Sequence, residues 1–366
     1  MTQAQLEKFV NYLQKENWLV FGPVWFADEN PPEDISPYLK AHQTETPKEP
    51  GVVLIKQINH ASELAFEKGL PFYSFKRFFV PECEKLFAYQ NDTLKEINQP
   101  AKIALIGVDL LDLKAINLYD QVFEKDPYYQ ARRRHILIVG QANVPEIDPS
   151  TSSGQENIFG YRFEEDTLEH LPFDIFLAAK NELRKTANYK IFTGSLKGQR
   201  ILEHFGYDNY THIQFSGPVK EGRSDELMEL LRNKLKNHPN PKIWEELGKR
   251  CIECGKCTIV CPTCFCFRID DMPALAEGTG ARQRQWDSCF YQEFSEVSGT
   301  DAPGKGKPKF LNSTAERIHF WYFHKFARIP DEFDFMGCVG CKRCAKVCPV
   351  GIDISEVLEN IEKVEN

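Results

Sequence analysis

Eleven of the twelve cysteines in the 366-residue chain fall between Cys251 and Cys348. Eight of them form two runs with the same spacing, Cys-x2-Cys-x2-Cys-x3-Cys-Pro. Bacterial two-cluster ferredoxins use this spacing to bind [4Fe–4S] clusters through cysteine thiolates. The pattern therefore predicts one-electron transfer. The first run holds Cys251, Cys254, Cys257 and Cys261, and the second holds Cys338, Cys341, Cys344 and Cys348.

The ferredoxin spacing also predicts which cysteines share a cluster. The first three cysteines of a run wrap one cluster, and the fourth reaches across to the other. The chain from residue 262 to residue 337 must then fold back to bring the two runs together. The predicted ligands are Cys251, Cys254, Cys257 and Cys348 for cluster one, and Cys338, Cys341, Cys344 and Cys261 for cluster two.

Two other uses of these cysteines were weighed against iron–sulfur ligation. Zinc sites take four ligands, usually as two CxxC or CxxH pairs, and do not need three closely spaced cysteines followed by Cys-Pro. A disulfide framework would place closely spaced thiols in a reducing compartment, where they exchange readily. The spacing therefore favours two iron–sulfur clusters over both alternatives. Zinc binding remains the non-redox alternative.

Four cysteines lie outside the two predicted ligand sets. A third cluster that uses all four is arithmetically possible, but nothing in the sequence brings Cys83 to the others. The alternatives are thiols packed against the clusters, or a ligand set for a separate metal. These candidates for further metal binding or packing are Cys264, Cys266 and Cys289.

The elements before the cysteine runs indicate an α/β domain. The apolar runs 102–108 and 135–140 flank a helix-like segment, 113–123, which predicts β-α-β and a largely parallel sheet. Near the N-terminus, an apolar stripe at helical spacing predicts a first helix. Its members are Leu6, Phe9, Val10 and Leu13.

The best domain boundary is the Pro-rich stretch 238–241, because two prolines stop the preceding helix. We expect an α+β protein. An N-terminal α/β scaffold and docking domain spans residues 1–237. A mainly helical, ferredoxin-like domain with two [4Fe–4S] clusters spans residues 242–366, with an insertion between its cysteine runs.

The sequence resembles the β subunits of sulfhydrogenase-type NiFe hydrogenases and the related A subunits of anaerobic sulfite reductases. The resemblance covers most of the chain. It is carried by the segments 251–257, 261–266, 286–289, 322–326 and 338–349, with weaker similarity at 76–78 and 107–133.

The resemblance implies a non-catalytic electron-transfer subunit. Its implied partners are a flavoprotein that exchanges electrons with NAD(P)H and the small and large subunits of a NiFe hydrogenase. Sulfite or sulfur reductase subunits are the alternative. Family members commonly have a cysteine where this chain has Leu111, and the region after Val139 lacks further family cysteines. Any metal site built from those residues is therefore expected to be absent.

Composition excludes several other functions. The net charge of −8 argues against nucleic acid as a partner. No apolar run is long enough for membrane insertion, and the N-terminus lacks the pattern of a secretory signal, so we expect a cytoplasmic protein. The sequence has no Rossmann fingerprint and no catalytic constellation. His324 is interpreted as a packed or surface residue, and Trp286 and Phe265 as shields of the clusters.

Overall fold

The structure is a computed structural model, and it separates into two compact units. Unit 1 comprises Met1–Phe79 and Gln99–Val219, and unit 2 comprises Val80–Asn98 and Lys220–Asn366. The predicted boundary at 238–241 lies inside unit 2. The described residues are 1–27, 51–91, 93–95, 100–141, 165–179, 188–220, 226–237, 241–274, 278–297 and 307–363.

Unit 1 is built around a seven-stranded sheet with the order β2-β1-β5-β6-β7-β8-β9. Four of its neighbouring pairs are parallel, and only β1–β2 and β7–β8 are antiparallel. The prediction of a largely parallel sheet is confirmed. The strands are β1 (Leu19–Ala27), β2 (Gly51–Gln57), β5 (Ile103–Val108), β6 (Ile136–Gln141), β7 (Ile175–Ala179), β8 (Tyr189–Thr193) and β9 (Thr211–His212).

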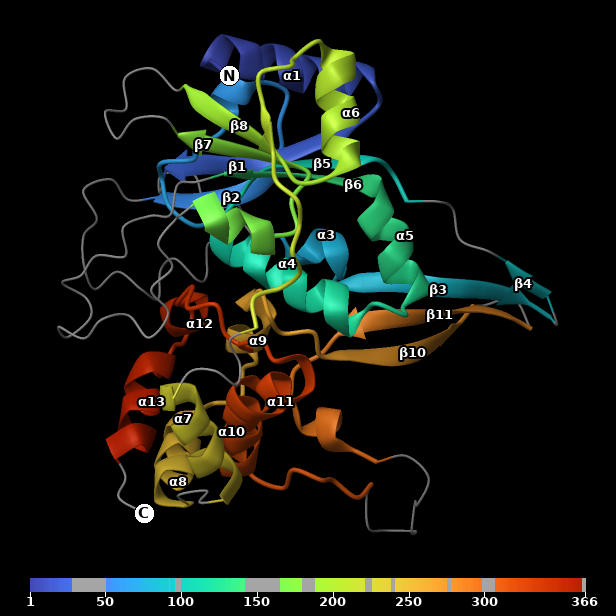
Figure 1. The fold of residues 1–366 in the computed structure, drawn as a ribbon. Helices are drawn as coiled ribbons and strands as arrows, with labels where there is room; N and C mark the ends of the chain where they lie inside the picture. The colour runs from blue at the N-terminus through green and yellow to red at the C-terminus, as the bar shows by residue number, and fades with distance from the viewer. Residues whose placement is uncertain are drawn as a thin grey trace. The chain divides into compact units, whose positions relative to one another are not determined.

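Helices cover this sheet on both faces (Figure 1). α1 (Gln3–Lys15) and α6 (Leu196–Phe205) lie on one face, where the predicted stripe of α1 is fully buried. α4 (Leu110–Val122) connects β5 to β6, as predicted, and is followed by α5 (Pro127–His135). α4 begins three residues before the predicted segment because the Asp109 side chain accepts a hydrogen bond from the backbone N–H of Asp112 and so caps the helix. A short helix, α3 (Lys76–Phe79), completes the unit.

Unit 2 contains helices around the cysteine runs. Together with unit 1 they confirm the predicted α+β class. A π-helix, His324–Arg328, directly follows α10. The helices are α7 (Glu226–Asn237), α8 (Pro241–Arg250), α9 (Lys256–Val260), α10 (Thr314–Phe323), α11 (Ile329–Phe333), α12 (Arg343–Lys346) and α13 (Ile354–Lys363).

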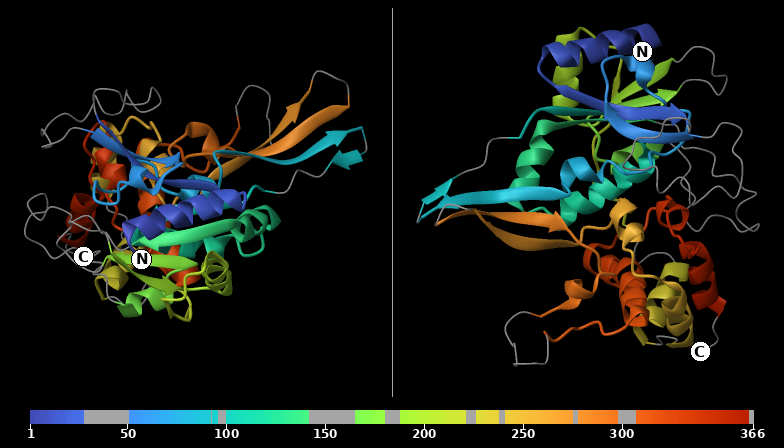
Figure 2. Two further views of the ribbon diagram at one scale, coloured as in Figure 1. Left: turned by 90° about the horizontal axis from the view of Figure 1, so that it is seen from above. Right: turned by 180° about the vertical axis from the view of Figure 1, so that it is seen from behind.

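Unit 2 also contains an antiparallel sheet that the sequence did not predict, with the order β10-β11-β3-β4. Figure 2 shows β10, β11 and β3 running side by side as a long, narrow sheet. β10 (Phe267–Pro273) and β11 (Thr279–Trp286) pair antiparallel within the insertion between the cysteine runs, which folds back on itself as expected. β3 (Cys83–Gln90) and β4 (Thr93–Lys95) come from the N-terminal half of the chain.

The pairing of β3 with β11 explains why unit 2 includes residues 80–98. Arg284 lies directly opposite Glu84, and their side chains form an ion pair at 2.6 Å with exposed fractions of 7% and 10%. Cys83 lies on the same strand and therefore belongs to unit 2, although the sequence assigned it to the N-terminal domain. In the part of the chain that the structure describes, no helix is long and apolar enough to cross a membrane.

Candidate metal centre

The first cysteine run begins in the loop between α8 and α9, which holds Cys251 and Cys254, continues with Cys257 on α9 and ends at Cys261 directly after that helix. The turn that leads to its third cysteine depends on Gly255, which has φ of +69° and directly precedes the first turn of α9. A Cβ atom at this position would lie 2.6 Å from the ring of Tyr291. Only glycine combines this backbone conformation with the close approach of the ring. The loop therefore turns back sharply between Cys254 and Cys257.

The second run begins beside the π-helix and ends after α12. Cys338 and Cys341 lie in the segment before α12, Cys344 lies on α12, and Cys348 follows it. α12 packs against α9. This contact brings the two runs together, although residues 262–337 separate them in the sequence.

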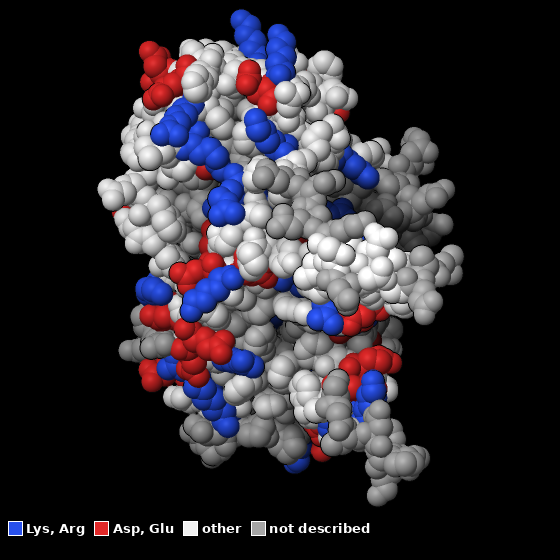
Figure 3. Space-filling view, turned by 90° about the vertical axis from the view of Figure 1, so that its right-hand side faces the viewer, with Lys and Arg blue, Asp and Glu red and all other residues white. Residues whose placement is uncertain are grey.

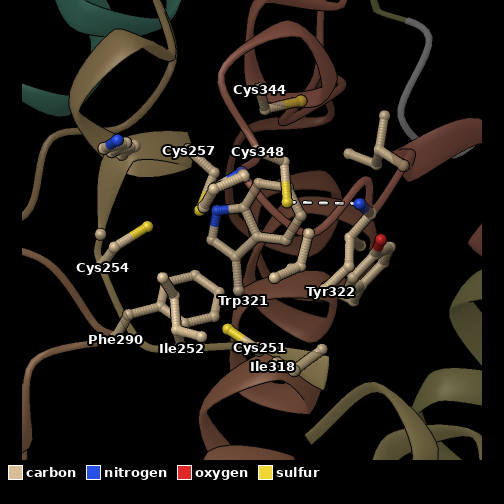
Figure 4. A pocket seen from close by; sticks show the side chains of 16 residues that line it. Cys251, Ile252, Cys254, Cys257, Phe290, Ile318, Trp321, Tyr322, Cys344 and Cys348 are labelled. Carbon is tan, nitrogen blue, oxygen red and sulfur yellow. Dashed lines mark hydrogen bonds between the residues drawn. The ribbon is translucent and has the colours of Figure 1, made fainter. Parts of the chain in front are cut away.

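The structure brings three cysteines of the first run together with two from the second run. Cys251, Cys254, Cys257, Cys344 and Cys348 all line a single cavity (Figure 4). Four of them are the crossed set predicted for cluster one, and the fifth, Cys344, belongs to the set predicted for cluster two. The walls between the sulfurs are mainly apolar, and they are formed by Phe290, Ile318, Trp321, Tyr322, Ile352 and Ile354, among others.

The cavity fits a cluster better than a single ion. Its volume is about 50 Å³, whereas one water needs only about 10–15 Å³ of such space. Within the described ranges, no three His, Cys, Asp or Glu side chains are arranged to hold one metal ion. The donor set consists of soft thiols alone, as iron–sulfur clusters require. Zinc would need four of these groups around a single point.

Cys261, the fourth cysteine of the first run, lies close to the second run. Burial raises the pKa of Cys344 well above its ordinary value, and the nearby thiols of Cys338, Cys261 and Cys341 raise it further. Burial also raises the pKa of Cys341 to about 12, with Cys261 again contributing. Buried neighbouring thiols of this kind are costly to ionise unless a metal centre takes up the negative charge.

Backbone N–H groups point at three of the cysteine sulfurs. Glu253 donates to Cys251 Sγ at 3.4 Å, and Gly340 donates to Cys338 Sγ at 3.5 Å. The N–H of Ile352 donates to Cys348 Sγ at 3.2 Å, drawn as a dashed line in Figure 4. Such hydrogen bonds stabilise thiolates and tune the potential of an iron–sulfur cluster.

A buried cation, Lys325, contacts Cys261, and the sequence did not single it out. Lys325 Nζ lies 3.3 Å from Cys261 Sγ. Burial lowers the pKa of Lys325, but the neighbouring Cys261, Cys264 and Cys338 outweigh this and raise it well above the ordinary value. A hydrogen bond from Cys264, together with the Lys325 charge, holds the pKa of Cys261 well below its ordinary value in spite of burial.

The three additional candidate cysteines form a group beside Cys261. Cys264 is hydrogen-bonded to Cys261, and Cys266 is hydrogen-bonded to Cys289, which is 2% exposed. Among the residues that the structure describes, these thiols do not make a site for a single metal ion. Cys83 lies apart, exposed on β3, and its thiol donates to the Gln283 side chain at 3.5 Å.

The aromatic residues around the cavity differ from those that the sequence indicated. Trp321 and Phe290 line it, but Trp286 and Phe265 do not. The indole N–H of Trp286 donates instead to the carbonyl of Val80. The one signal in the sequence for Trp321 was the group of aromatic residues that precedes the second cysteine run. Their helical spacing places apolar side chains on a buried helix face.

His324 is packed, as interpreted from the sequence. Its ring lies 5.6 Å from that of Phe265 and is stacked on that of Phe320 at 6.1 Å. Burial lowers the pKa of His324 to about 4, and the nearby charges of Lys325 and Arg328 lower it further. His324 is therefore neutral at physiological pH.

Acidic and basic side chains are interspersed on the face of the molecule shown in Figure 3. A nucleic-acid site would need a concentrated basic surface.

Known proteins share both the cysteine region and most of the chain. A family described as a 4Fe-4S dicluster domain matches residues 250–352. Sulfhydrogenase 2 subunit beta of Pyrococcus furiosus is 28% identical over 320 residues, which cover 84% of this chain and 88% of that protein. No solved structure matches. The predicted resemblance to sulfhydrogenase β subunits is confirmed.

Proposed function

We propose that this chain, which carries a 4Fe-4S dicluster domain and is related to sulfhydrogenase β subunits, relays single electrons between two partner subunits. One partner is a flavin-containing NAD(P)H oxidoreductase, and the other is a catalytic NiFe hydrogenase module. The observation that carries the proposal is the cavity in which Cys348 and Cys344 of the second run join Cys251, Cys254 and Cys257. Its thiol donors suit electron-transfer clusters, and the rest of its lining is mainly apolar.

The proposed relay has two [4Fe–4S] clusters with crossed ligands. When bound, each cluster supplies one reversible one-electron step. The protein holds the clusters, surrounds them with apolar side chains and directs backbone N–H groups at the ligand sulfurs. The proposed ligands are Cys251, Cys254, Cys257 and Cys348 for cluster one, and Cys338, Cys341, Cys344 and Cys261 for cluster two.

We propose unit 1 as the scaffold and docking unit of the relay. Leu111, at the position where the resemblance implies a family cysteine, is 4% exposed and lies on α4. At this position the chain provides packing and no metal ligand. The parallel sheet, covered by helices on both faces, gives a rigid surface for partner subunits.

The first test measures metal content and spectrum after anaerobic purification of the full chain. The proposal expects about eight iron and eight sulfide per chain, with broad visible absorbance that bleaches on reduction. Stoichiometric zinc without sulfide would support the non-redox alternative and refute the proposal.

The second test identifies the partners. The tagged chain, purified anaerobically from its own cells, should retain a flavoprotein and the two NiFe hydrogenase subunits. Co-purification with a sulfite or sulfur reductase would keep the relay but replace the hydrogenase partner.

A Cys83→Ser variant is a suitable control for cysteine variants, because this thiol is exposed and lies on β3.

A further inference from the structure

A π-helix places one lysine inside unit 2. The π-helix His324–Arg328 directly continues α10, and such turns are rare and frequently lie at functional sites. It contains Lys325, whose side chain is 1% exposed. A buried lysine is costly unless its charge is compensated. The cost points to a negative partner.

The Lys325 ammonium has three N–H donors and three acceptors within reach. Nζ lies 3.3 Å from Cys261 Sγ, 3.0 Å from Thr263 Oγ1 and 3.0 Å from the carbonyl oxygen of Gly337. The Thr263 hydroxyl donates its own proton to the Gly337 carbonyl at 2.8 Å, so its lone pairs are available to the lysine. The geometry matches a fully hydrogen-bonded ammonium.

The backbone fixes the lysine relative to both cysteine runs. The N–H of Gly337 donates to the Lys325 carbonyl at 3.1 Å, and a Cβ atom on Gly337 would lie 2.4 Å from that oxygen. Gly337 directly precedes Cys338, the first cysteine of the second run. The same lysine therefore contacts Cys261 and, through its backbone, the start of the run with which Cys261 is proposed to share a cluster.

We infer that Lys325 sets the reduction potential of cluster two through its hydrogen bond to Cys261 Sγ. The inference rests on the proposed function. A reduced cluster carries one more negative charge than an oxidised one. A fixed cation and a hydrogen bond at a ligand sulfur stabilise the reduced form more and raise the potential. Lys325 acts through Cys261 and is a positioning residue, with no part in chemistry of its own.

The test replaces Lys325 in the full chain by Met, Gln and Arg. Methionine keeps the unbranched stem but removes both charge and donors, glutamine keeps a donor, and arginine keeps both. Arg328→Gln is the matched control, because Arg328 is a cation on the same π-helix with a side chain that is 54% exposed. The measurement is an anaerobic redox titration followed by EPR, with iron and sulfide content determined for every variant.

The expected result is a change in one of the two titration steps. At a fixed ambient potential, Lys325→Met should lower the ratio of reduced to oxidised cluster two at least tenfold, which for one electron is about 59 mV. Lys325→Gln should lie between Met and wild type. Lys325→Arg and Arg328→Gln should stay within threefold of wild type. The step of cluster one should not move in any variant.

Two results would overturn the inference. One is an unchanged titration in a Met or Gln variant that retains full iron and sulfide. The other is loss of cluster two from both neutral variants with retention in Lys325→Arg, which would assign the lysine to assembly. If the wild-type chain itself lacked iron and sulfide, the proposed function would fail, and this outcome is distinct from either.

Discussion

Replacing Arg317 by methionine should destabilise the loop that carries the first cysteine run. Arg317, on α10, forms an ion pair with Glu253 at 3.2 Å, and its side chain is 3% exposed. Glu253 lies between Cys251 and Cys254 and has φ of +54°, a left-handed conformation that is unfavourable for a residue with a side chain. The ion pair therefore holds a strained residue in place at the proposed cluster one.

The magnitude follows from the burial of the two partners. Removing one partner of a fully buried pair costs about 3–5 kcal/mol, because the other charge is left uncompensated. Glu253 is 19% exposed and also contacts the Gln292 side chain at 3.4 Å. We therefore expect a smaller loss of about 2–3 kcal/mol in the free energy of unfolding. For a unit of this size the loss lowers Tm by about 4–12 °C.

The assay is anaerobic thermal unfolding, followed by visible absorbance for the clusters and by circular dichroism for the backbone. Arg328→Met is the control, because its ion pair with Glu332 is exposed and should contribute about 0.5 kcal/mol or less. If the uncompensated carboxylate causes the loss, then adding Glu253→Gln to Arg317→Met should recover part of it. A Tm of Arg317→Met within about 1 °C of wild type would refute the reasoning.

Three further predictions concern the clusters, pH and the second sheet. Cys348→Ser should remove the same EPR component as Cys251→Ser, and removal of a different component would refute the crossed ligand sets. Because the pKa of His324 is lowered to about 4 from 6.5, the unfolded chain binds more protons between these values. Stability should thus fall by about 1.3 kcal/mol from pH 7.5 to 5.5, and His324→Gln should remove this part of the pH dependence of Tm. Arg284→Met should remove the cation that lies 2.6 Å from the buried Glu84 carboxylate, with a loss of about 3–5 kcal/mol in the free energy of unfolding. The check is faster amide exchange in β3, and unchanged exchange would contradict the role given to the ion pair.

Local patterns in the sequence were sufficient for four elements of unit 1, namely α1, β5, α4 and β6. The apolar stripe of α1, the apolar runs of β5 and β6 and the helix between them all depend on residues close in the chain. Their periodicity follows directly from helix and strand geometry. The same locality explains why the start of α4 was displaced, since a single capping aspartate decided it.

The set of chain segments that form unit 2 could not be predicted in the same way. β3 pairs with β11, about 200 residues later in the chain, and strand pairing over such a separation leaves no local pattern. The sequence therefore assigned Cys83 to the N-terminal domain. The burial of Lys325 has the same cause, because its acceptors lie on segments 62 and 12 residues away.

The two cysteine runs show which properties the sequence determined and which only the tertiary structure decided. Their spacing determined the ligand type and the kind of chemistry, because coordination by three closely spaced thiolates is a local property of the chain. The packing of α9 against α12, the apolar cavity around Cys348 and the cation at Cys261 depended on the fold of the segment between the runs. Charge and burial around a cluster are set by residues distant in sequence, so only the tertiary structure decides them.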